Sequence, residues 1–231
     1  MTVDIVLSAG WLAFARHIGF LEGLTDQGIE VEAVVGTSSG SLVGALWAAG
    51  LTLDAIAEEV TATRPFQALR PSRTPWKGVC SMGRFMKRLE RHLPARFEDL
   101  DRPFAVGVCT GPKTAHLLTS GSLIEAVAAS CAVPGLFSPV NVDGKRWLDG
   151  GYADRTAVDG WRQWRPNNTG LLHLIESTRG DFPAPQGITT VRSPPSGAHL
   201  WSFGDHKAQR TETRALTQSV LDSSALLGSD A

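Results

Sequence analysis

The chain has 231 residues, of which 42% are hydrophobic and 19% charged, and its formal net charge is −1. This length allows one α/β domain with a sizeable core, and the composition is ordinary for a globular protein. The near-neutral charge excludes the strongly basic class of nucleic-acid-binding proteins, so no nucleic acid partner is expected.

Cysteines and targeting signals add few constraints. The three cysteines, Cys80, Cys109 and Cys131, lie far apart and form neither a CxxC pair nor a metal-ligand spacing. They are predicted to be free thiols in a reducing compartment. The N-terminus has no basic leader, and no run approaches the roughly 20 apolar residues of a membrane span. We therefore expect a cytoplasmic protein, whose substrate can still be a membrane surface.

The first third of the chain alternates strands and helices. Apolar runs predict strands at residues 3–7 and 31–35, and apolar residues at helical spacing predict helices at 11–26, 41–49 and 53–60. Such repeats imply a parallel sheet with right-handed crossovers. The predicted fold is therefore α/β, with a mostly parallel central sheet between two helical layers in a single domain, residues 1–231.

Residues 61–102 differ in character from the rest. This segment carries ten basic and four acidic residues, and residues 82–92 have the pattern of a basic amphipathic helix. One interpretation is a solvated helical excursion packed by its aromatic side chains. The other is a cap over the site, whose bases attract anionic head groups and give peripheral membrane contact.

The remaining elements are shorter. Strands are predicted at residues 103–110, 115–118, 140–141, 145–148 and 171–175, and a short helix at 123–130. Residues 179–197 are rich in Pro and Gly and are predicted to be a loop. A last helix is expected at about 205–221, followed by a frayed tail at 222–231.

The stretch Gly36-Thr37-Ser38-Ser39-Gly40 follows an apolar strand and opens a helix. A serine on such a sharp turn has its hydroxyl lifted toward a ligand, and the flanking glycines remove Cβ atoms that would clash. The helix N-terminus behind it favours a developing negative charge. Ser38 is therefore the predicted nucleophile.

A nucleophilic serine needs a base, and the chain offers no histidine in a triad context. Both His17 and His173 are interpreted as satisfied core residues. Asp149 ends a strand and is followed by Gly150 and Gly151, which leave its carboxylate open to approach. The sequence Asp-Gly-Gly is also common in turns, so the residues alone leave open whether Asp149 is the base or only a turn residue.

Four segments in this order resemble the patatin-like phospholipase family, whose members use a Ser-Asp dyad. They are Leu7-Ser8-Ala9-Gly10 with His17-Ile18-Gly19-Phe20-Leu21, then Val35-Gly36-Thr37-Ser38-Ser39-Gly40, then Ser130-Cys131-Ala132-Val133-Pro134-Gly135-Leu136-Phe137-Ser138-Pro139, and Asp143-Gly144-Lys145-Arg146-Trp147-Leu148-Asp149-Gly150-Gly151. The resemblance implies Ser38 as nucleophile, Asp149 as base, and acyl-ester hydrolysis through an acyl-enzyme. It implies lipid substrates and no metal or organic cofactor.

The segment expected to form the oxyanion hole departs from this family. The family has Gly-Gly-Gly-x-Arg/Lys-Gly where this chain has Ala9-Gly10-Trp11-Leu12-Ala13-Phe14. The N–H groups of Gly10 and Trp11 can still serve as donors, but Trp11 narrows the approach and Phe14 crowds the turn. Residues 154–158 also lack the family's usual proline. Three hypotheses follow: a serine acyl hydrolase, an acyltransferase or ring-forming condensation enzyme, and a degenerate lipid-binding protein.

Overall fold

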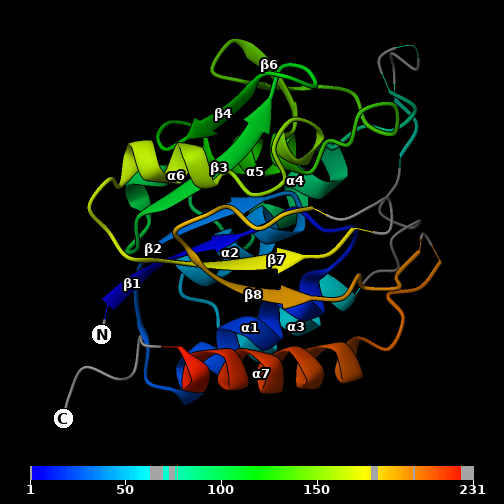
Figure 1. The fold of residues 1–231 in the computed structure, drawn as a ribbon. Coiled ribbons are helices and arrows are strands. Elements are labelled where there is room, and N and C mark those ends of the chain that lie inside the picture. Colours follow the sequence, from blue (N-terminus) through cyan, green and yellow to red (C-terminus); the bar gives the residue numbers. More distant parts are fainter. Residues whose placement is uncertain are drawn as a thin grey trace.

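The computed structural model describes residues 2–62, 70–72, 76, 78–177, 182–199 and 201–224. The described chain forms an eight-stranded sheet in the order β5-β6-β3-β2-β1-β7-β8, with β4 paired to β3 (Figure 1). The strands are β1 (Thr2–Leu7), β2 (Glu30–Thr37), β3 (Phe104–Cys109), β4 (Ala115–Leu118), β5 (Val140–Val142), β6 (Lys145–Asp149), β7 (Gly170–Ile175) and β8 (Thr189–Ser193).

The centre of the sheet is parallel. Strands β3, β2, β1, β7 and β8 all run in the same direction, and β4, β5 and β6 add antiparallel pairs at one side. The central strands are apolar and almost wholly buried because helices cover both faces. Thus the mostly parallel sheet predicted from the sequence is confirmed.

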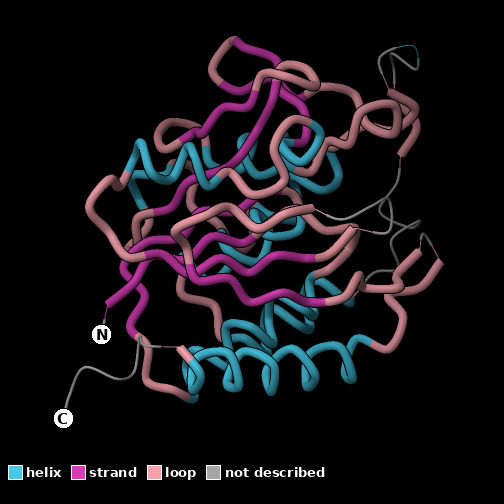
Figure 2. Tube along the Cα trace, viewed as in Figure 1, coloured by secondary structure: helices cyan, strands magenta, loops and turns pink. Residues whose placement is uncertain are grey.

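Helices lie on both faces of the sheet, as Figure 2 shows in cyan around the magenta strands. Residues Ile5 and Leu7 of β1 belong to a large core with side chains from the helices α1–α5 and α7, whereas Val6 belongs to a small core with Trp161 of α6. Because alternate residues of a strand face opposite sides, these two cores fill the two faces of the sheet. The helices are α1 (Phe14–Asp26), α2 (Ser39–Ala48), α3 (Leu53–Thr61), α4 (Gly83–Leu89), α5 (Leu123–Ser130), α6 (Val158–Trp164) and α7 (His206–Ser223), with 3-10 turns η3 (Phe97–Asp99) and η4 (Gly150–Tyr152).

Several predicted boundaries were wrong. The first helix begins at Phe14 rather than at residue 11, because residues 11–13 form a turn in which Leu12 has a φ of +48°. The predicted helix at 82–92 is shorter, and α6 was not predicted at all. The final helix extends to Ser223, so the predicted tail at 222–231 begins too early, and its residues 225–231 lie outside the described residues.

The predicted loop at 179–197 contains an edge strand. In β8 only Val191 and Ser193 are buried, and prolines flank the strand on both sides. A polar edge strand of this kind lacks the apolar run that predicts a buried strand, and the surrounding Pro and Gly residues favour a loop. Residues 178–181 of this stretch lie outside the described residues, as do 63–69, 73–75 and 77 of the basic segment.

None of the helices in the described part of the chain is both long and apolar enough to cross a bilayer.

Candidate active site

Ser38 lies on a strained turn between β2 and α2. Its φ of +53° and ψ of −118° are rare for a residue with a side chain, and the surrounding packing holds them. A Cβ on Gly40 would lie 2.3 Å from the carbonyl oxygen of Leu7, and one on Gly36 would lie 2.5 Å from that of Gly40. Only glycine fits at these two positions, so the close approach of β1, β2 and α2 requires the sequence pattern around Ser38.

Asp149 faces Ser38 from a different part of the sheet. The Ser38 hydroxyl donates a hydrogen bond of 2.7 Å to Oδ2 of Asp149. Strand β6 pairs with β3, which in turn pairs with β2, and this topology brings the ends of β2 and β6 to the same place. The other carboxylate oxygen, Oδ1, accepts from the N–H of Gly151 at 2.8 Å. Both oxygens of Asp149 are therefore fixed.

The environment of Asp149 favours its neutral form. Only 5% of the residue is exposed. Burial raises the pKa of its carboxyl from 3.8 to about 6, although the hydrogen bonds from Ser38 and Gly151 act in the opposite direction. A carboxylate with a pKa near 6 is ionised at neutral pH and is a stronger base than an ordinary aspartate.

Hydrogen bonds from neighbouring polar side chains hold the backbone of the Ser38 turn. The N–H of Ser38 donates a hydrogen bond to Oγ of Ser130 at 2.8 Å, and the Ser130 hydroxyl donates one to the carbonyl of Gly107 at 2.7 Å. The Ser38 carbonyl accepts from Oγ of Ser41 at 2.7 Å and from the thiol of Cys131 at 3.3 Å. Burial holds the pKa of that thiol well above its usual range, so Cys131 is present as a neutral donor.

Gly10, Trp11 and Leu12, which follow Ala9 after β1, line the same cavity as Ser38. The N–H of Ala9 donates to the carbonyl of Arg155 at 2.7 Å, and the Arg155 guanidinium donates back to the Ala9 carbonyl at 3.1 Å. Within the described part of the chain, the N–H groups of Gly10 and Trp11 donate to no protein acceptor. Two backbone donors without a protein acceptor therefore belong to residues that line the cavity at Ser38, in a segment that Arg155 holds by hydrogen bonds.

One of the two bulky residues of this segment lies differently from expectation. Phe14 does not crowd the turn, because it opens α1 and meets the ring of Phe203 edge-on, with centroids 6.2 Å apart. Trp11 is 46% exposed and lines the pocket next to Ser38.

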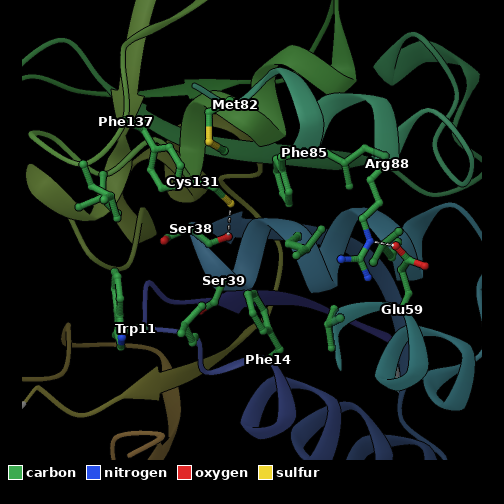
Figure 3. Close-up of a pocket in the computed structure, with 18 of the residues that line it drawn as sticks. Trp11, Phe14, Ser38, Ser39, Glu59, Met82, Phe85, Arg88, Cys131 and Phe137 are labelled. Atoms are coloured by element: carbon green, nitrogen blue, oxygen red, sulfur yellow. Dashed lines mark hydrogen bonds and ion pairs between the residues drawn. The ribbon is translucent and has the colours of Figure 1, made fainter. Parts of the chain in front are cut away.

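A cavity of about 160 Å³ opens at Ser38. Figure 3 shows Ser38 and Trp11 toward one side of it, Met82, Phe85 and Phe137 above, and Glu59 and Arg88 at the opposite end. Its lining is otherwise almost wholly apolar and comes from α2, α3, α4 and the loop after α5. The arrangement presents the Ser38 hydroxyl, with Asp149 hydrogen-bonded to it, to an apolar cavity that suits a hydrocarbon chain.

The two histidines interpreted as core residues are buried and contact each other. The distance between their Nδ1 atoms is 2.9 Å, and Nε2 of His17 lies 3.3 Å from Oγ of Ser39. Burial lowers the pKa of His17 to about 3 and that of His173 well below its usual range, so both rings are neutral. Within the described residues neither ring bonds to the Ser38 hydroxyl, which leaves Asp149 as its partner.

The sequence profile of one family, described as patatin-like phospholipase, matches residues 5–160. The chain belongs to the patatin-like phospholipase family. The match covers both Ser38 and Asp149, and the resemblance inferred from the four sequence segments is thereby confirmed.

Two relatives illustrate how far this similarity extends. The neuropathy target esterase sws of Drosophila melanogaster is 28% identical over 183 residues, which are 75% of this chain and 12% of that protein. An uncharacterised NTE family protein of Mycobacterium tuberculosis is 32% identical over 165 residues, or 66% of this chain and 43% of that protein. The chain thus spans less than half the length of either relative.

Solved structures with low sequence identity share the fold. VipD from Legionella pneumophila superimposes with a TM-score of 0.60 at 13% identity, covering 96% of this chain and 67% of VipD. ExoU of Pseudomonas aeruginosa, in complex with SpcU, gives a TM-score of 0.55 at 14% identity, covering 96% of this chain and 52% of that chain. These likenesses support the patatin-like fold of this chain.

The structure brings most of the predicted site residues together. Apart from Ser38 and Asp149, they line the cavity, donate to Asp149 or allow the backbone to pack closely around the site: Gly10, Trp11, Gly36, Ser39, Gly40, Gly150 and Gly151. Sequence reasoning missed Ser130, although it begins one of the family-like segments, and it missed Arg155. It counted Arg88 among the surface bases, whereas Arg88 lines the cavity.

Proposed function

We propose that this chain is a serine acyl hydrolase that cleaves lipid esters through a Ser38–Asp149 dyad. The observation that carries the proposal is the 2.7 Å hydrogen bond from the Ser38 hydroxyl to Asp149, at the mouth of an apolar cavity. A protein that only binds lipid needs neither the strained serine nor the partly desolvated carboxylate.

In the first half of the reaction, Ser38 Oγ forms a bond to the ester carbonyl carbon while its proton passes to Asp149. The tetrahedral intermediate then collapses, the bond to the leaving alcohol breaks, and the proton on Asp149 goes to that alcohol. The products of this half are the free alcohol and an acyl ester on Ser38.

In the second half, water takes the place of the alcohol. Asp149 accepts a proton from the attacking water, the acyl–Ser38 bond breaks, and the proton returns to Ser38 Oγ. The sum is one ester and one water converted to one carboxylic acid and one alcohol.

The negative charge of each intermediate needs hydrogen-bond donors. We assign this role to the N–H groups of Gly10 and Trp11, which have no protein acceptor among the described residues. Removing one such donor typically costs about a hundred- to a thousandfold in kcat. The Arg155 guanidinium donates hydrogen bonds to the carbonyls of Ala9 and Ile175, and these bonds keep the segment that contains Gly10 and Trp11 in position. This support compensates for the glycines that the family has and this chain lacks.

Lipid aggregates are the proposed physical form of the substrate. Of the basic segment 61–102, Lys87 and Arg91 are exposed, whereas Arg88 turns into the cavity. The exposed bases are proposed to contact anionic head groups at a membrane surface. Flotation with anionic vesicles, but not with neutral ones, is the expected result, and equal flotation with both would contradict it.

The proposal is tested with p-nitrophenyl octanoate and purified protein. Ser38→Ala and Asp149→Ala are each expected to abolish turnover, and the exposed Ser223→Ala should retain it. Activity that survives Asp149→Ala would exclude the dyad. Trapping the acyl adduct and adding water or an alcohol separates a hydrolase from an acyltransferase, because only a transferase discharges preferentially to the alcohol.

A further inference from the structure

The cavity at Ser38 ends in two charged side chains, Glu59 of α3 and Arg88 of α4. Charged groups are costly to bury beside hydrocarbon unless they are paired or serve a ligand. The rest of the cavity lining suits a plain alkyl chain and gives no reason for a guanidinium at its far end.

The cavity runs along α2. Ser38, Leu42 and Leu46 line it, and residues four apart lie on one face of a helix. Eight residues at 1.5 Å each give a path of roughly 12 Å from Ser38 to the level of Leu46. An extended chain advances about 1.2 Å per atom, so this path accommodates an acyl chain of about ten atoms. In Figure 3 the ion pair of Arg88 and Glu59 lies at the end opposite Ser38.

Glu59 occupies only one side of the Arg88 guanidinium. Nε of Arg88 bonds to Oε1 of Glu59, whose other oxygen lies 3.1 Å from Nε2 of His92. The Nη2 atom of Arg88 is buried and has no hydrogen-bond partner in the described part of the chain. Figure 3 shows the terminal nitrogens of Arg88 on the side of the guanidinium away from the Glu59 carboxylate, and one of them points toward the other lining residues.

An acyl chain that ends in a methyl group would pack against the Nη–H donors of Arg88. It would exclude water from these donors without giving them a hydrogen-bond acceptor. A chain that ends in an oxygen acceptor would satisfy them, and a carboxylate gives the strongest such bond because both partners are charged. The guanidinium has five donors in a planar fork, so it can hold Glu59 through Nε and a second acceptor through its Nη atoms.

We propose that Arg88 selects acyl chains of medium length that end in an oxygen acceptor, with a terminal carboxylate preferred. The proposal rests on the proposed function, since it takes the cavity to be the acyl site of the Ser38 reaction. Arg88 is a specificity residue in this account and touches the end of the chain that does not react.

The first test compares p-nitrophenyl octanoate with the p-nitrophenyl monoester of suberic acid, which has the same chain length and a terminal carboxylate. The wild-type protein is expected to favour the suberate ester by about tenfold or more in kcat/KM, as for a hydrogen bond to a charged group. Arg88→Met should remove the preference, and Arg88→Lys should keep part of it. The exposed Arg91→Met makes the same chemical change at a base that does not line the cavity and should keep the full preference.

The second test measures binding without turnover. Ser38→Ala protein is titrated with monomethyl suberate and with methyl octanoate, and tighter binding of the suberate is expected, with the difference lost in Ser38→Ala/Arg88→Met. If the wild type hydrolyses both esters equally and the two ligands bind equally, the Arg88 assignment fails while the proposed function stands. If neither ester is hydrolysed but suberate binding depends on Arg88, the proposed function fails and the acceptor site remains.

Glu59→Gln gives a further readout. Removing its negative charge releases Nε of Arg88 and lifts the repulsion of an incoming carboxylate, so the preference for the suberate ester should increase. A preference that falls in Glu59→Gln while the protein keeps its wild-type circular dichroism would overturn the assignment, because it would identify the ion pair itself as the feature recognised.

Discussion

Replacing Asp149 with asparagine is expected to abolish ester turnover and, at neutral pH, to stabilise the protein. The carboxyl of Asp149 is buried, and its pKa rises from 3.8 in the unfolded chain to about 6 in the fold. Between these values the folded state binds the proton more tightly than the unfolded state does. The free energy of unfolding therefore falls as the pH rises from about 4 to about 6, and the loss persists above pH 6.

The size of this effect follows from the two pKa values. Each pKa unit corresponds to about 1.4 kcal/mol, so the charged carboxylate costs the fold about 3 kcal/mol at neutral pH. Asparagine has nearly the same shape, can accept from the N–H of Gly151, and carries no charge. Allowing for imperfect hydrogen bonding to Ser38, we expect Asp149→Asn to be more stable than wild type by about 1–3 kcal/mol at pH 7.5. Near pH 4 the difference should almost vanish.

Urea unfolding of both proteins at pH 4 and pH 7.5 measures this difference, and the melting temperature should rise by several degrees at the higher pH. The control is Asp159→Asn, which makes the same change at a side chain that is 85% exposed and should have little effect at either pH. The reasoning is refuted if Asp149→Asn is no more stable than wild type at pH 7.5, or if its advantage is equal at both pH values.

Three further outcomes follow from the same contacts. The kcat/KM of the wild type should fall on the acid side with a midpoint near pH 6, because Asp149 must be ionised to accept a proton, and a midpoint near 4 would contradict this. Ser130→Ala removes the acceptor of the Ser38 N–H, which should lower the free energy of unfolding by about 2 kcal/mol in urea titrations; an unchanged value would show that this bond carries no stability. Gly40→Ala should prevent folding or lower the melting temperature strongly, since its Cβ would collide with backbone 2.3 Å away, whereas Gly83→Ala has open space and should melt like wild type.

The parallel centre of the sheet could be predicted from sequence because its strands are buried on both faces and appear as continuous apolar runs. Strand β8 and helix α6 could not be predicted in the same way. Strand β8 is a polar edge strand between prolines, and α6 is only seven residues long and follows a left-handed Ala157. Short or marginal elements take their conformation from packing against the rest of the fold, which local sequence does not record.

The candidate site likewise combines residues that local sequence predicts with contacts that depend on tertiary packing. Ser38 and Asp149 could be proposed because each lies in a short motif, but they are 111 residues apart in the chain, and their hydrogen bond depends on the pairing of β6 with β3. Sequence periodicity predicted a basic helix around Arg88 without revealing which of its bases faces inward. That depends on how α4 packs over the cavity, a tertiary property.

The central claim is that Ser38 becomes acylated during turnover. The most direct test is an acid quench of the protein during turnover of p-nitrophenyl octanoate, followed by mass spectrometry of the intact chain and its peptides. The account predicts an added octanoyl group on the peptide that contains Ser38, absent from Ser38→Ala. Sustained turnover with no adduct on that peptide, or an adduct on another residue that forms equally in Ser38→Ala, would contradict it.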